Sequence, residues 1–514
     1  MNRRQVRWLF LVVAVLFLAG GITDPAGSRV HADDTAGPEA YKDLADHNPI
    51  MTQRFGADPY AMVYDGRVYV YMTHDVIQRN HEGEIVENTY GEINSINCLS
   101  SDDMVNWTDH GWIQAGWEIA EDGWTGITDW ARNSWAPTVT YKKIDGKDRF
   151  FLYFANSGNG IGVLTADHPV GPYTDPLGEA LVTRATPNCA DVVWLFDPAV
   201  LVDDDGKAYL YFGGGVPEGK EEMPNTGRVV QLGDDMISLA GTPQVVEAPW
   251  FFEAAFVNKI GDTYYYSYCT NWAERPAGKD APEKAVIAYM TSDNPLGPWE
   301  YQGVIFRNPG VYFGSYGNNH HSFVEFNGKW YFFYHTRLLE NIMGISAGYR
   351  STHVEEMTIT ADGVIQPVKG SFAGVKQVKP FNPYRENEAE TMAWNAGITT
   401  EPTKERSAIF GEVNMVVTGM TTGSFIGLAG VDFGETGPKS FTAKVASVSA
   451  GNTITIRIGD PEGEAIGKVE VPQTGSMEEF VEVTVAVEKV QGRHDLFFVF
   501  TGEAFAFDAW SFAQ

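Results

Sequence analysis

The chain has few cysteines and few basic residues. Only Cys98, Cys189 and Cys269 occur among 514 residues. An odd, widely spaced set cannot form a disulfide-stapled scaffold, so we expect buried free thiols. No local sequence suggests the base that a catalytic thiol would need. Lys and Arg number 37 against 67 Asp and Glu, a formal net charge of −30. With no dense basic run beyond the N-terminus, nucleic acid and anionic membranes are excluded as expected partners.

Long hydrophobic runs are also missing after the first 32 residues. Three arginines within the first seven residues precede the apolar stretch Trp8–Ala19, and Val30-His31-Ala32 has the small-x-small form of a cleavage site. We therefore predict a signal peptide at residues 1–32, a loose mature N-terminal segment at 33–46, and a secreted, extracellular protein without a membrane contact after cleavage. An uncleaved anchor is the alternative, although the stretch is short for a span of ~20 residues.

Glycine and aromatic residues, in contrast, occur in a repeated pattern. Five times, a tight turn built on Gly precedes a short strand crowded with aromatics. A hairpin repeated at wide, regular spacing is typical of a β-propeller, with one sheet in each blade. The turns are Asp65-Gly66, Asp145-Gly146, Asp205-Gly206, Gly261-Asp262 and Asn327-Gly328.

Four ionisable residues precede four of these turn glycines by eight or nine positions. They are Asp58, Asp197, Glu253 and His320. If this position is the mouth end of the innermost strand of each blade, radial symmetry brings all four side chains to the axis. The pattern therefore predicts a pocket in which three carboxylates meet.

A change in composition divides the chain after Pro380–Tyr384. Beyond it the aromatic hairpins stop and alternating Thr, Val and Gly strands follow. The predicted fold class is all-β, with a five-bladed β-propeller at residues 47–384 and a β-sandwich (jelly roll) at 385–514. No low-complexity linker separates the two regions, so we expect them to pack together.

Three carboxylates in one pocket suit the hydrolysis of a glycosidic bond. That reaction needs an acid for the leaving oxygen and a base or nucleophile at the anomeric carbon. Mutual repulsion and burial raise the pKa of at least one of the crowded groups, which keeps a proton available near neutral pH. The alternative is structural, because Asp58-Pro59 and Asp197-Pro198 can also end strands in turns.

Three segments resemble the signatures of glycoside hydrolase family 43. They are Phe55–Pro59, Leu195–Ala199 and Pro249–Ala254. The resemblance implies a five-bladed propeller that inverts the anomeric configuration. It also implies that Asp58 is the general base, that Glu253 is the general acid, and that Asp197 raises the pKa of that acid and orients it. Inversion requires the acid and base to be roughly 6.5–9.5 Å apart.

Four further residues are candidates for substrate binding. Trp135 and Trp272 offer aromatic faces of the kind on which sugar rings pack, although either can equally belong to the core. The family resemblance implies that His320 lies on the propeller axis, where calcium or its waters often occur, and that Arg350 binds sugar hydroxyls. The alternatives are His321 for His320, Arg337 for Arg350, and purely structural roles.

Within the family, the chain most resembles arabinoxylan-debranching arabinofuranosidases. This resemblance implies removal of α-L-arabinofuranosyl side groups from arabinoxylan, a plant cell-wall polysaccharide, by a chain that we expect to be a monomer. β-Xylosidase and endo-arabinanase activities remain alternatives within the family. A non-catalytic polysaccharide-binding protein and a retaining propeller hydrolase that acts on fructans are alternatives outside it.

Residues 385–514 resemble a family 6 carbohydrate-binding module. In that family an acidic pair near the start and an Asp near the end hold a structural calcium, and these positions fall on Glu388, Glu390 and Asp508. Carboxylate oxygens suit Ca²⁺, although plain surface acids are the alternative. The chain departs from the family where sugar binds, because Ser476–Phe480 and the short Thr501–Ala504 lack the usual aromatic and Asn-rich loop. Phe480 and Phe425 are partial substitutes.

Overall fold

The computed structural model describes residues 37–120, 123–277 and 281–514. The predicted signal peptide and the start of the predicted mature segment lie outside the described residues. Within the described part of the chain, no helix is long and apolar enough to cross a membrane. Helix is confined there to α1 (Gly310–Phe313) and α2 (Leu338–Ile342), so the fold is all-β, as predicted. Cys98, Cys189 and Cys269 are buried and free, which confirms the prediction for the thiols.

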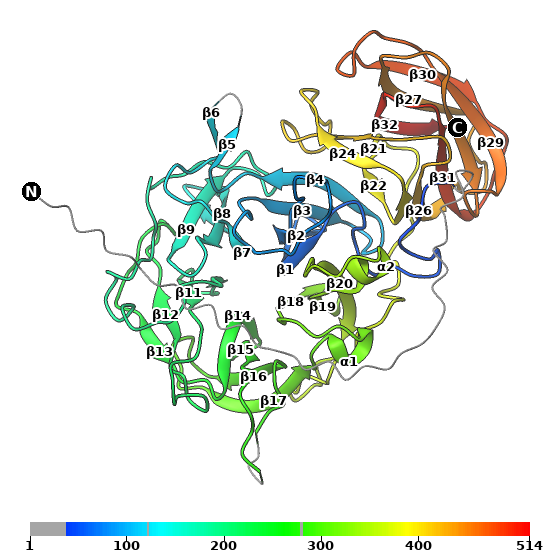
Figure 1. Ribbon diagram of the computed structural model, residues 1–514. Coiled ribbons are helices and arrows are strands. Elements are labelled where there is room, and N and C mark those ends of the chain that lie inside the picture. Colours follow the sequence, from blue (N-terminus) through cyan, green and yellow to red (C-terminus); the bar gives the residue numbers. More distant parts are fainter. Residues whose placement is uncertain (1–36, 121–122, 278–280) are drawn as a thin grey trace, which may run out of the picture. The chain divides into compact units, whose positions relative to one another are not determined.

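Antiparallel sheets follow one another along residues 56–357 and are arranged around a common centre (Figure 1). Sheet 1 contains β1 (Gly56–Tyr64), β2 (Arg67–His74), β3 (Ile96–Ser101) and β4 (Trp107–Ile113). Sheet 2 contains β7 (Trp135–Ile144), β8 (Lys147–Ala155) and β9 (Ile161–Ala166). Sheet 3 contains β10 (Ala199–Val202), β11 (Ala208–Phe212), β12 (Gly227–Gln231) and β13 (Gln244–Val246). Sheet 4 contains β14 (Phe251–Ile260), β15 (Thr263–Thr270), β16 (Ile287–Ser292) and β17 (Glu300–Phe306). Sheet 5 contains β18 (His321–Phe326), β19 (Lys329–Thr336) and β20 (Ser351–Met357), and a small hairpin of β5 (Glu118–Ala120) and β6 (Gly123–Thr125) lies between sheets 1 and 2.

All five predicted glycine turns connect the first two strands of a sheet. In the Asp65-Gly66 turn both residues have positive φ, 46° and 71°. This conformation matches the right-handed twist of the flanking strands, and Gly adopts it without steric cost. Each first strand therefore runs from the mouth end of its sheet to its glycine turn. The second strand runs back to the mouth end.

Strand irregularities occur at the mouth ends of the first strands. The β1–β2 register shifts between Ala57 and Tyr60, and Asp58 in this bulge has a φ of 49°. Asp197 has a similar φ of 50°, and its neighbour is likewise a proline. In sheet 4 the left-handed residue is Ala254, with a φ of 61°, so Glu253 lies one residue earlier than the equivalent aspartates. The equivalence that we predicted from glycine spacing is therefore approximate for Glu253.

Buried tyrosines connect neighbouring sheets. The hydroxyl of Tyr71 on β2 donates to the Pro169 carbonyl at 2.8 Å, and that of Tyr153 on β8 donates to the Met236 carbonyl at 2.6 Å. Both donors are fully buried in aromatic and aliphatic clusters between sheets. A buried tyrosine needs such a partner for its polar end, so the aromatic-rich second strands supply both the core and the connections between sheets.

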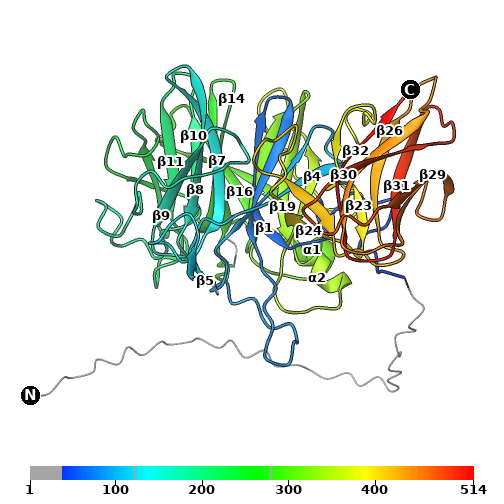
Figure 2. The ribbon, with the colours of Figure 1, turned by 90° about the horizontal axis from the view of Figure 1, so that it is seen from above.

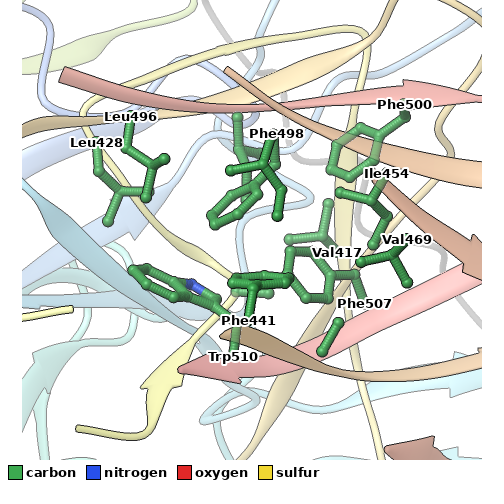
Figure 3. Packing of buried hydrophobic residues seen from close by; sticks show 14 of the residues in the cluster. Val417, Leu428, Phe441, Ile454, Val469, Leu496, Phe498, Phe500, Phe507 and Trp510 are labelled. Atoms are coloured by element: carbon green, nitrogen blue, oxygen red, sulfur yellow. The ribbon is translucent and has the colours of Figure 1, made fainter. Parts of the chain in front are cut away.

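The C-terminal region is built from two packed sheets. One contains β24 (Thr399–Pro402), β25 (Met415–Thr418), β32 (Phe505–Ala513), β27 (Ser440–Ser447) and β30 (Val481–Ala486), with β21 (Asn387–Glu388) paired to β32. The other contains β23 (Trp394–Ala396), β26 (Phe425–Asp432), β31 (Arg493–Thr501), β28 (Asn452–Ile458) and β29 (Glu464–Val471). Figure 3 shows Phe441, Phe498 and Trp510 packed together in the core between them. The alternating strands expected beyond Tyr384 are present in both of these sheets.

The two regions share a sheet. Strand β22 (Thr391–Met392), from the C-terminal region, pairs with β4 and becomes the fifth strand of sheet 1. Beside it the fully buried carboxylate of Asp109 accepts hydrogen bonds from Gln53 Nε2 at 2.9 Å and Thr400 Oγ1 at 2.7 Å, and it also pairs with Arg54. The expectation that the regions pack together is confirmed by these contacts.

Candidate active site

A cavity of about 520 Å³ opens where the first strands of the sheets begin. Six of the seven catalytic and substrate-binding residues predicted from sequence line it. Its walls are formed by Asp58, Tyr90, Ile93, Trp135, Ser157, Gly158, Trp194, Phe196, Asp197, Phe252, Glu253, Asn318, His320 and Arg350. Residues separated by nearly 300 positions therefore meet in one hollow, because each sheet contributes the mouth end of its first strand or an adjoining loop.

Asp58 is held by three kinds of hydrogen bond. Its side-chain Oδ2 accepts the Thr73 hydroxyl at 2.7 Å, and Arg350 Nη1 donates to Oδ1 at 3.0 Å. Its backbone N–H donates to Nδ1 of His335 at 2.9 Å. The left-handed backbone at Asp58 is thus supported by a side chain from sheet 5, which offsets a conformation that is costly for a non-glycine residue.

Arg350 is itself fixed by a second buried carboxylate. Asp75 accepts Arg350 Nε at 2.8 Å and Nη2 at 2.7 Å, and it also accepts the Arg350 backbone N–H at 3.0 Å. The guanidinium lies 4.9 Å from the ring centre of Tyr90. A forked donor held on two edges has one orientation, so Arg350 presents Nη1 to Asp58. Arg337, the alternative from sequence, is absent from the cavity lining and lies 4.0 Å from Glu340.

His335 has a defined tautomer. Its Nδ1 accepts the N–H of Asp58, so its Nε2 carries the proton and donates to the Asn318 carbonyl at 3.0 Å. His335 therefore connects the backbone of Asp58 to the segment that contains Asn318 and His320. Nδ1 of His320 lies 3.5 Å from Asp58 Oδ1 and 3.8 Å from Asp197 Oδ2, between the two carboxylates. His321, the alternative to His320, is buried and bonded to Ser267 at 2.6 Å instead.

The three carboxylates have different surroundings. Asp197 accepts the backbone N–H of Ala254 at 2.8 Å, directly after Glu253. Burial raises the pKa of Asp197 to about 6, with the charge of Asp58 acting in the same direction and His320 against it. Burial, then the charges of Asp197 and Asp58, raise the pKa of Glu253 well above its usual value. Glu253 therefore keeps its proton most readily.

Asp58 has the opposite tendency. Burial favours its neutral form, but the charge of Arg350 more than compensates and holds the pKa of Asp58 well below its usual value. One cavity therefore contains a carboxylate that stays ionised and a carboxylic acid that stays protonated. Such a pair can remove a proton from one group and deliver a proton to another across a single bound substrate.

Aromatic side chains line the rest of the cavity. Trp135, as predicted, is among them, and its Nε1 donates to the Tyr90 carbonyl at 3.2 Å. Trp194 is 38% exposed and lies edge-on to Phe252, at 5.5 Å between ring centres. Trp272 is absent from the lining and is 42% exposed just after β15, so its role in substrate binding stays a prediction.

Several functional candidates were not found from sequence. Asp75 and His335 act through Arg350 and Asp58, and neither occupies a repeated position in the hairpin pattern. Tyr90 and Asn318 come from connecting segments without periodicity. In sheet 2 the pair Ala136-Pro137 occupies the place of the Asp-Pro pairs in sheets 1 and 3. Ala136 also has a left-handed φ of 43° at the equivalent bulge. That position has no ionisable group.

A second group of acids lies in the C-terminal region. Glu388, Glu390 and Asp508 are all buried, at 3%, 2% and 1% exposure. Lys444 Nζ contacts Asp508 Oδ2 at 2.7 Å, and Asn414 Nδ2 donates to its Oδ1 at 2.8 Å. Burial raises the pKa of Glu388 to about 7, and burial followed by the charge of Glu388 raises that of Glu390.

The donor atoms of this second group suit a hard cation. Glu390 Oε2 and Asn414 Oδ1 are buried oxygens without a hydrogen-bond partner. Oxygen donors of this kind match the preference of Ca²⁺. In the described part of the chain, however, no three His, Cys, Asp or Glu side chains are grouped closely enough to enclose a metal ion as they stand. The chemistry of the residues therefore fits calcium, whereas their spacing requires adjustment around it.

The substitutes proposed for the sugar site of this region are not open platforms. Phe425 is 8% exposed and packs edge-on against Phe497, at 5.8 Å. Phe480 is half-buried, with Lys444 Nζ 5.6 Å from its ring centre. Both rings contribute to packing, so neither offers the free face on which a sugar ring would stack.

Known protein families match both the region around the cavity and the C-terminal region. The family model described as glycosyl hydrolases family 43 matches residues 46–365, and that of carbohydrate binding module (family 6) matches residues 388–514. An arabinoxylan arabinofuranohydrolase of Paenibacillus polymyxa is 44% identical over 512 residues, which cover 97% of this chain and 79% of that protein. An arabinoxylan arabinofuranohydrolase of Bacillus subtilis (strain 168) is 46% identical, with 92% and 93% covered. The crystal structure of a family 43 arabinoxylan arabinofuranohydrolase from Bacillus subtilis in complex with cellotetraose has a TM-score of 0.88, at 46% identity, with 92% and 98% covered.

Proposed function

The chain belongs to glycosyl hydrolase family 43, and on this basis we propose that it removes α-L-arabinofuranosyl side groups from arabinoxylan with inversion of configuration. The two relatives that it resembles along most of their length are both named for this activity. The observation that carries the proposal is the pair of unlike carboxylates in one cavity, Asp58 held ionised and Glu253 held protonated.

Asp58 is the proposed general base and Glu253 the proposed general acid. Asp58 takes a proton from a water molecule as the water oxygen forms a bond to the anomeric carbon. The bond between that carbon and the xylan oxygen breaks, and the Glu253 proton passes to the leaving oxygen. Asp197 keeps Glu253 protonated through its charge and orients it through the bond to the Ala254 amide.

The remaining predicted residues act on the sugar. Arg350 and His320 lie beside Asp58, where hydroxyl groups of a bound furanose accept and donate hydrogen bonds. Trp135 supplies an aromatic face inside the cavity. Trp272, outside the cavity, is assigned to the polymer rather than to the cleaved sugar.

Product stereochemistry tests this proposal. The enzyme is incubated with arabinoxylan and with 4-nitrophenyl α-L-arabinofuranoside, and proton NMR follows the first anomer formed. We expect β-L-arabinofuranose before mutarotation, no product from Asp58→Ala protein on either substrate, and none from Glu253→Ala protein on arabinoxylan. If the α anomer forms first, the enzyme does not invert the configuration. If a parallel panel of xylan, arabinan and aryl glycosides mainly releases xylose or arabinan fragments, arabinoxylan side groups are not the substrate.

We further propose that the sheets of residues 47–384 are the five blades of a propeller and that residues 385–514 form a sandwich module, apart from β22, which extends sheet 1. The repeated first-strand hairpins and their arrangement around a centre support the blades (Figure 1). A structural calcium held by Glu388, Glu390 and Asp508 is supported by the oxygens that lack partners. Secretion is supported by the arginines and the apolar stretch of the N-terminal sequence. The expectation that the chain is a monomer stays a prediction.

A further inference from the structure

The most exposed aromatic side chain among those that the structure describes is Tyr316, at 60%. It lies in residues 307–320, which connect β17 to β18 and contain α1. Asn318 and His320, near the end of the same segment, line the catalytic cavity. Consecutive Cα atoms are about 3.8 Å apart, so the Cα atoms of Tyr316 and Asn318 are at most about 7.6 Å apart. Tyr316 is therefore a close neighbour of the cavity without being part of its lining.

Strand pairing places this segment at the mouth end of the sheets. Across sheet 4, Glu253 pairs with Cys269, and Cys269 pairs with Ile287. Ile287 in turn pairs with Phe306, the last residue of β17. The segment that follows β17 therefore starts level with Glu253, and Figure 2 shows α1 and α2 near the side of the sheets where β5 lies. A polymer that delivers a side group into the cavity must pass over this side.

The ring of Tyr316 has one covered face and one open face. A Cβ on Gly310 would lie 2.4, 2.5 and 2.7 Å from Cγ, Cδ2 and Cδ1 of Tyr316. Because these distances to adjacent ring atoms are nearly equal, the ring must lie flat over the Cα of Gly310. Among the described residues no aromatic ring or cation packs on Tyr316, whereas Trp117 and Phe480 each have a cationic group over the ring. The face of Tyr316 away from Gly310 is therefore open to solvent.

Two side-chain amides hold the segment on either side of this ring. Asn341 Nδ2, on α2, donates to Ser315 Oγ at 2.7 Å. Asn308 Nδ2 donates to the Gly317 carbonyl at 2.8 Å, and Asn308 Oδ1 accepts the Gly310 N–H at 3.0 Å. Asn308, which is buried, thus fixes both the residue after the tyrosine and the glycine under its ring. An aromatic face that is held in place before a ligand arrives loses little conformational freedom on binding.

Arg337 supplies hydrogen-bond donors beside the ring. A Cβ on Gly317 would lie 3.1 Å from Arg337 Nε, so the guanidinium lies against the residue that follows Tyr316. Arg337 Nε is buried without a hydrogen-bond partner, and Glu340 Oε1, 4.0 Å away, is beyond hydrogen-bond distance. The Arg337 side chain is nevertheless 32% exposed. Its guanidinium therefore has donors left for an oxygen that a ligand supplies.

We propose that Tyr316 and Arg337 form a subsite for the xylan backbone, in which one xylosyl unit packs on the open face of Tyr316 and accepts a hydrogen bond from Arg337. An aromatic face beside an oriented polar donor suits a sugar ring, which has apolar CH faces and oxygen acceptors at its edge. The inference rests on the proposed function for the identity of the polymer. The subsite lies outside the cavity that takes the cleaved arabinofuranose, so it contributes to the binding of polymer and not to that of small aryl glycosides.

A comparison of two substrates tests the subsite. For Tyr316→Ala we expect kcat/KM on arabinoxylan to fall about tenfold, mainly through KM, with kcat/KM on 4-nitrophenyl α-L-arabinofuranoside within about twofold of wild type. Tyr316→Phe keeps the aromatic face and should stay within about twofold on both substrates. Arg337→Gln should lower kcat/KM on arabinoxylan by about threefold, because one hydrogen bond is lost. An equal fall in both activities of Tyr316→Ala protein, or no fall on arabinoxylan, refutes the subsite.

The matched control is Tyr141→Ala. Tyr141 is 38% exposed on β7, close to the Asp145-Gly146 turn and thus at the end of sheet 2 away from the mouth. We expect both activities of this variant to stay within about twofold of wild type, because a polymer bound at the mouth does not reach Tyr141. A selective loss on arabinoxylan equal to that of Tyr316→Ala would show that the loss does not depend on position, and would refute the subsite.

Direct binding separates failure of the subsite from failure of the proposed function. Asp58→Asn protein is titrated with xylotetraose by isothermal calorimetry, with and without Tyr316→Ala. The C-terminal sandwich is present in both proteins, so a difference between them belongs to Tyr316. We expect affinity to fall about tenfold when Tyr316 is replaced, whatever reaction the enzyme catalyses. Unchanged affinity refutes the subsite, whereas Tyr316-dependent binding by a protein without arabinofuranosidase activity refutes only the proposed reaction.

Discussion

The chain contains two groups of three buried carboxylates that differ in their access to solvent. Asp58, Asp197 and Glu253 line a cavity of about 520 Å³, whereas Glu388 of the C-terminal group lines a hollow of only about 10 Å³. A guanidinium holds Asp58 ionised in the first group, and Lys444 contacts Asp508 in the second. Three buried carboxylates beside a basic side chain can thus serve catalysis where a substrate can enter. Where no substrate can enter, they are suited to holding a cation.

Substituting one acid in each group should give the largest difference in activity between the two groups. Asp58→Asn should lower kcat/KM on arabinoxylan by about 10²–10⁴-fold, because the amide cannot take the proton from the attacking water. Asp508→Asn should leave kcat/KM within about twofold, since it touches no cavity residue. Initial rates, with circular dichroism to verify folding, measure both. Equal losses in the two variants would contradict the division.

The role of Glu253 as the acid is tested by changing the leaving group of the substrate. Glu253→Gln cannot protonate the departing oxygen, so its loss on arabinoxylan should reach about 10²–10⁴-fold. On an aryl arabinofuranoside with an acidic phenol the loss should be at least about tenfold smaller, because that group leaves without a proton. Rates on a series of phenols provide the measurement. The same loss on every member would assign the proton to another residue.

The charge of Asp197 sets the alkaline limit of activity. Asp197 has a pKa of about 6, so above that pH its negative charge disfavours ionisation of Glu253. Asp197→Asn keeps an acceptor for the Ala254 amide but removes the charge, so the pKa of Glu253 falls. The alkaline limb of the kcat/KM profile should therefore move to lower pH. An unmoved limb would show that Asp197 acts only by positioning.

Removal of the calcium proposed at Glu388, Glu390 and Asp508 should have a smaller effect, on Tm rather than on activity. At a calcium concentration about 100-fold above Kd, binding contributes about 2.7 kcal/mol, which corresponds to about 2–3 °C in Tm for a chain of this size. Differential scanning fluorimetry with calcium and with EDTA measures the shift, and Glu390→Gln should abolish it. Activity below the transition should not change. Loss of activity on chelation without a change in Tm would relocate the ion to the cavity.

Sequence patterns predicted most of the fold and the three cavity acids, because both follow from hairpins with a constant distance between a turn and a strand start. The offset of Glu253 relative to Asp58 could not be predicted, since a bulge moves the left-handed position by one residue without altering the spacing. Asp75 and His335 contribute through hydrogen bonds to other side chains. Such contacts leave no periodic signal in the chain, and neither do loop residues such as Tyr90.

The strand that the C-terminal region adds to sheet 1 has a practical consequence. Truncation after the predicted propeller would uncover the edge of β4, with unpaired backbone groups ready to join another chain. It would also take the Thr400 hydroxyl from Asp109, leaving that buried acid with fewer donors. Exchanging the sandwich for a module from another enzyme would need to supply both the strand and the hydroxyl, so this appendage is not freely interchangeable.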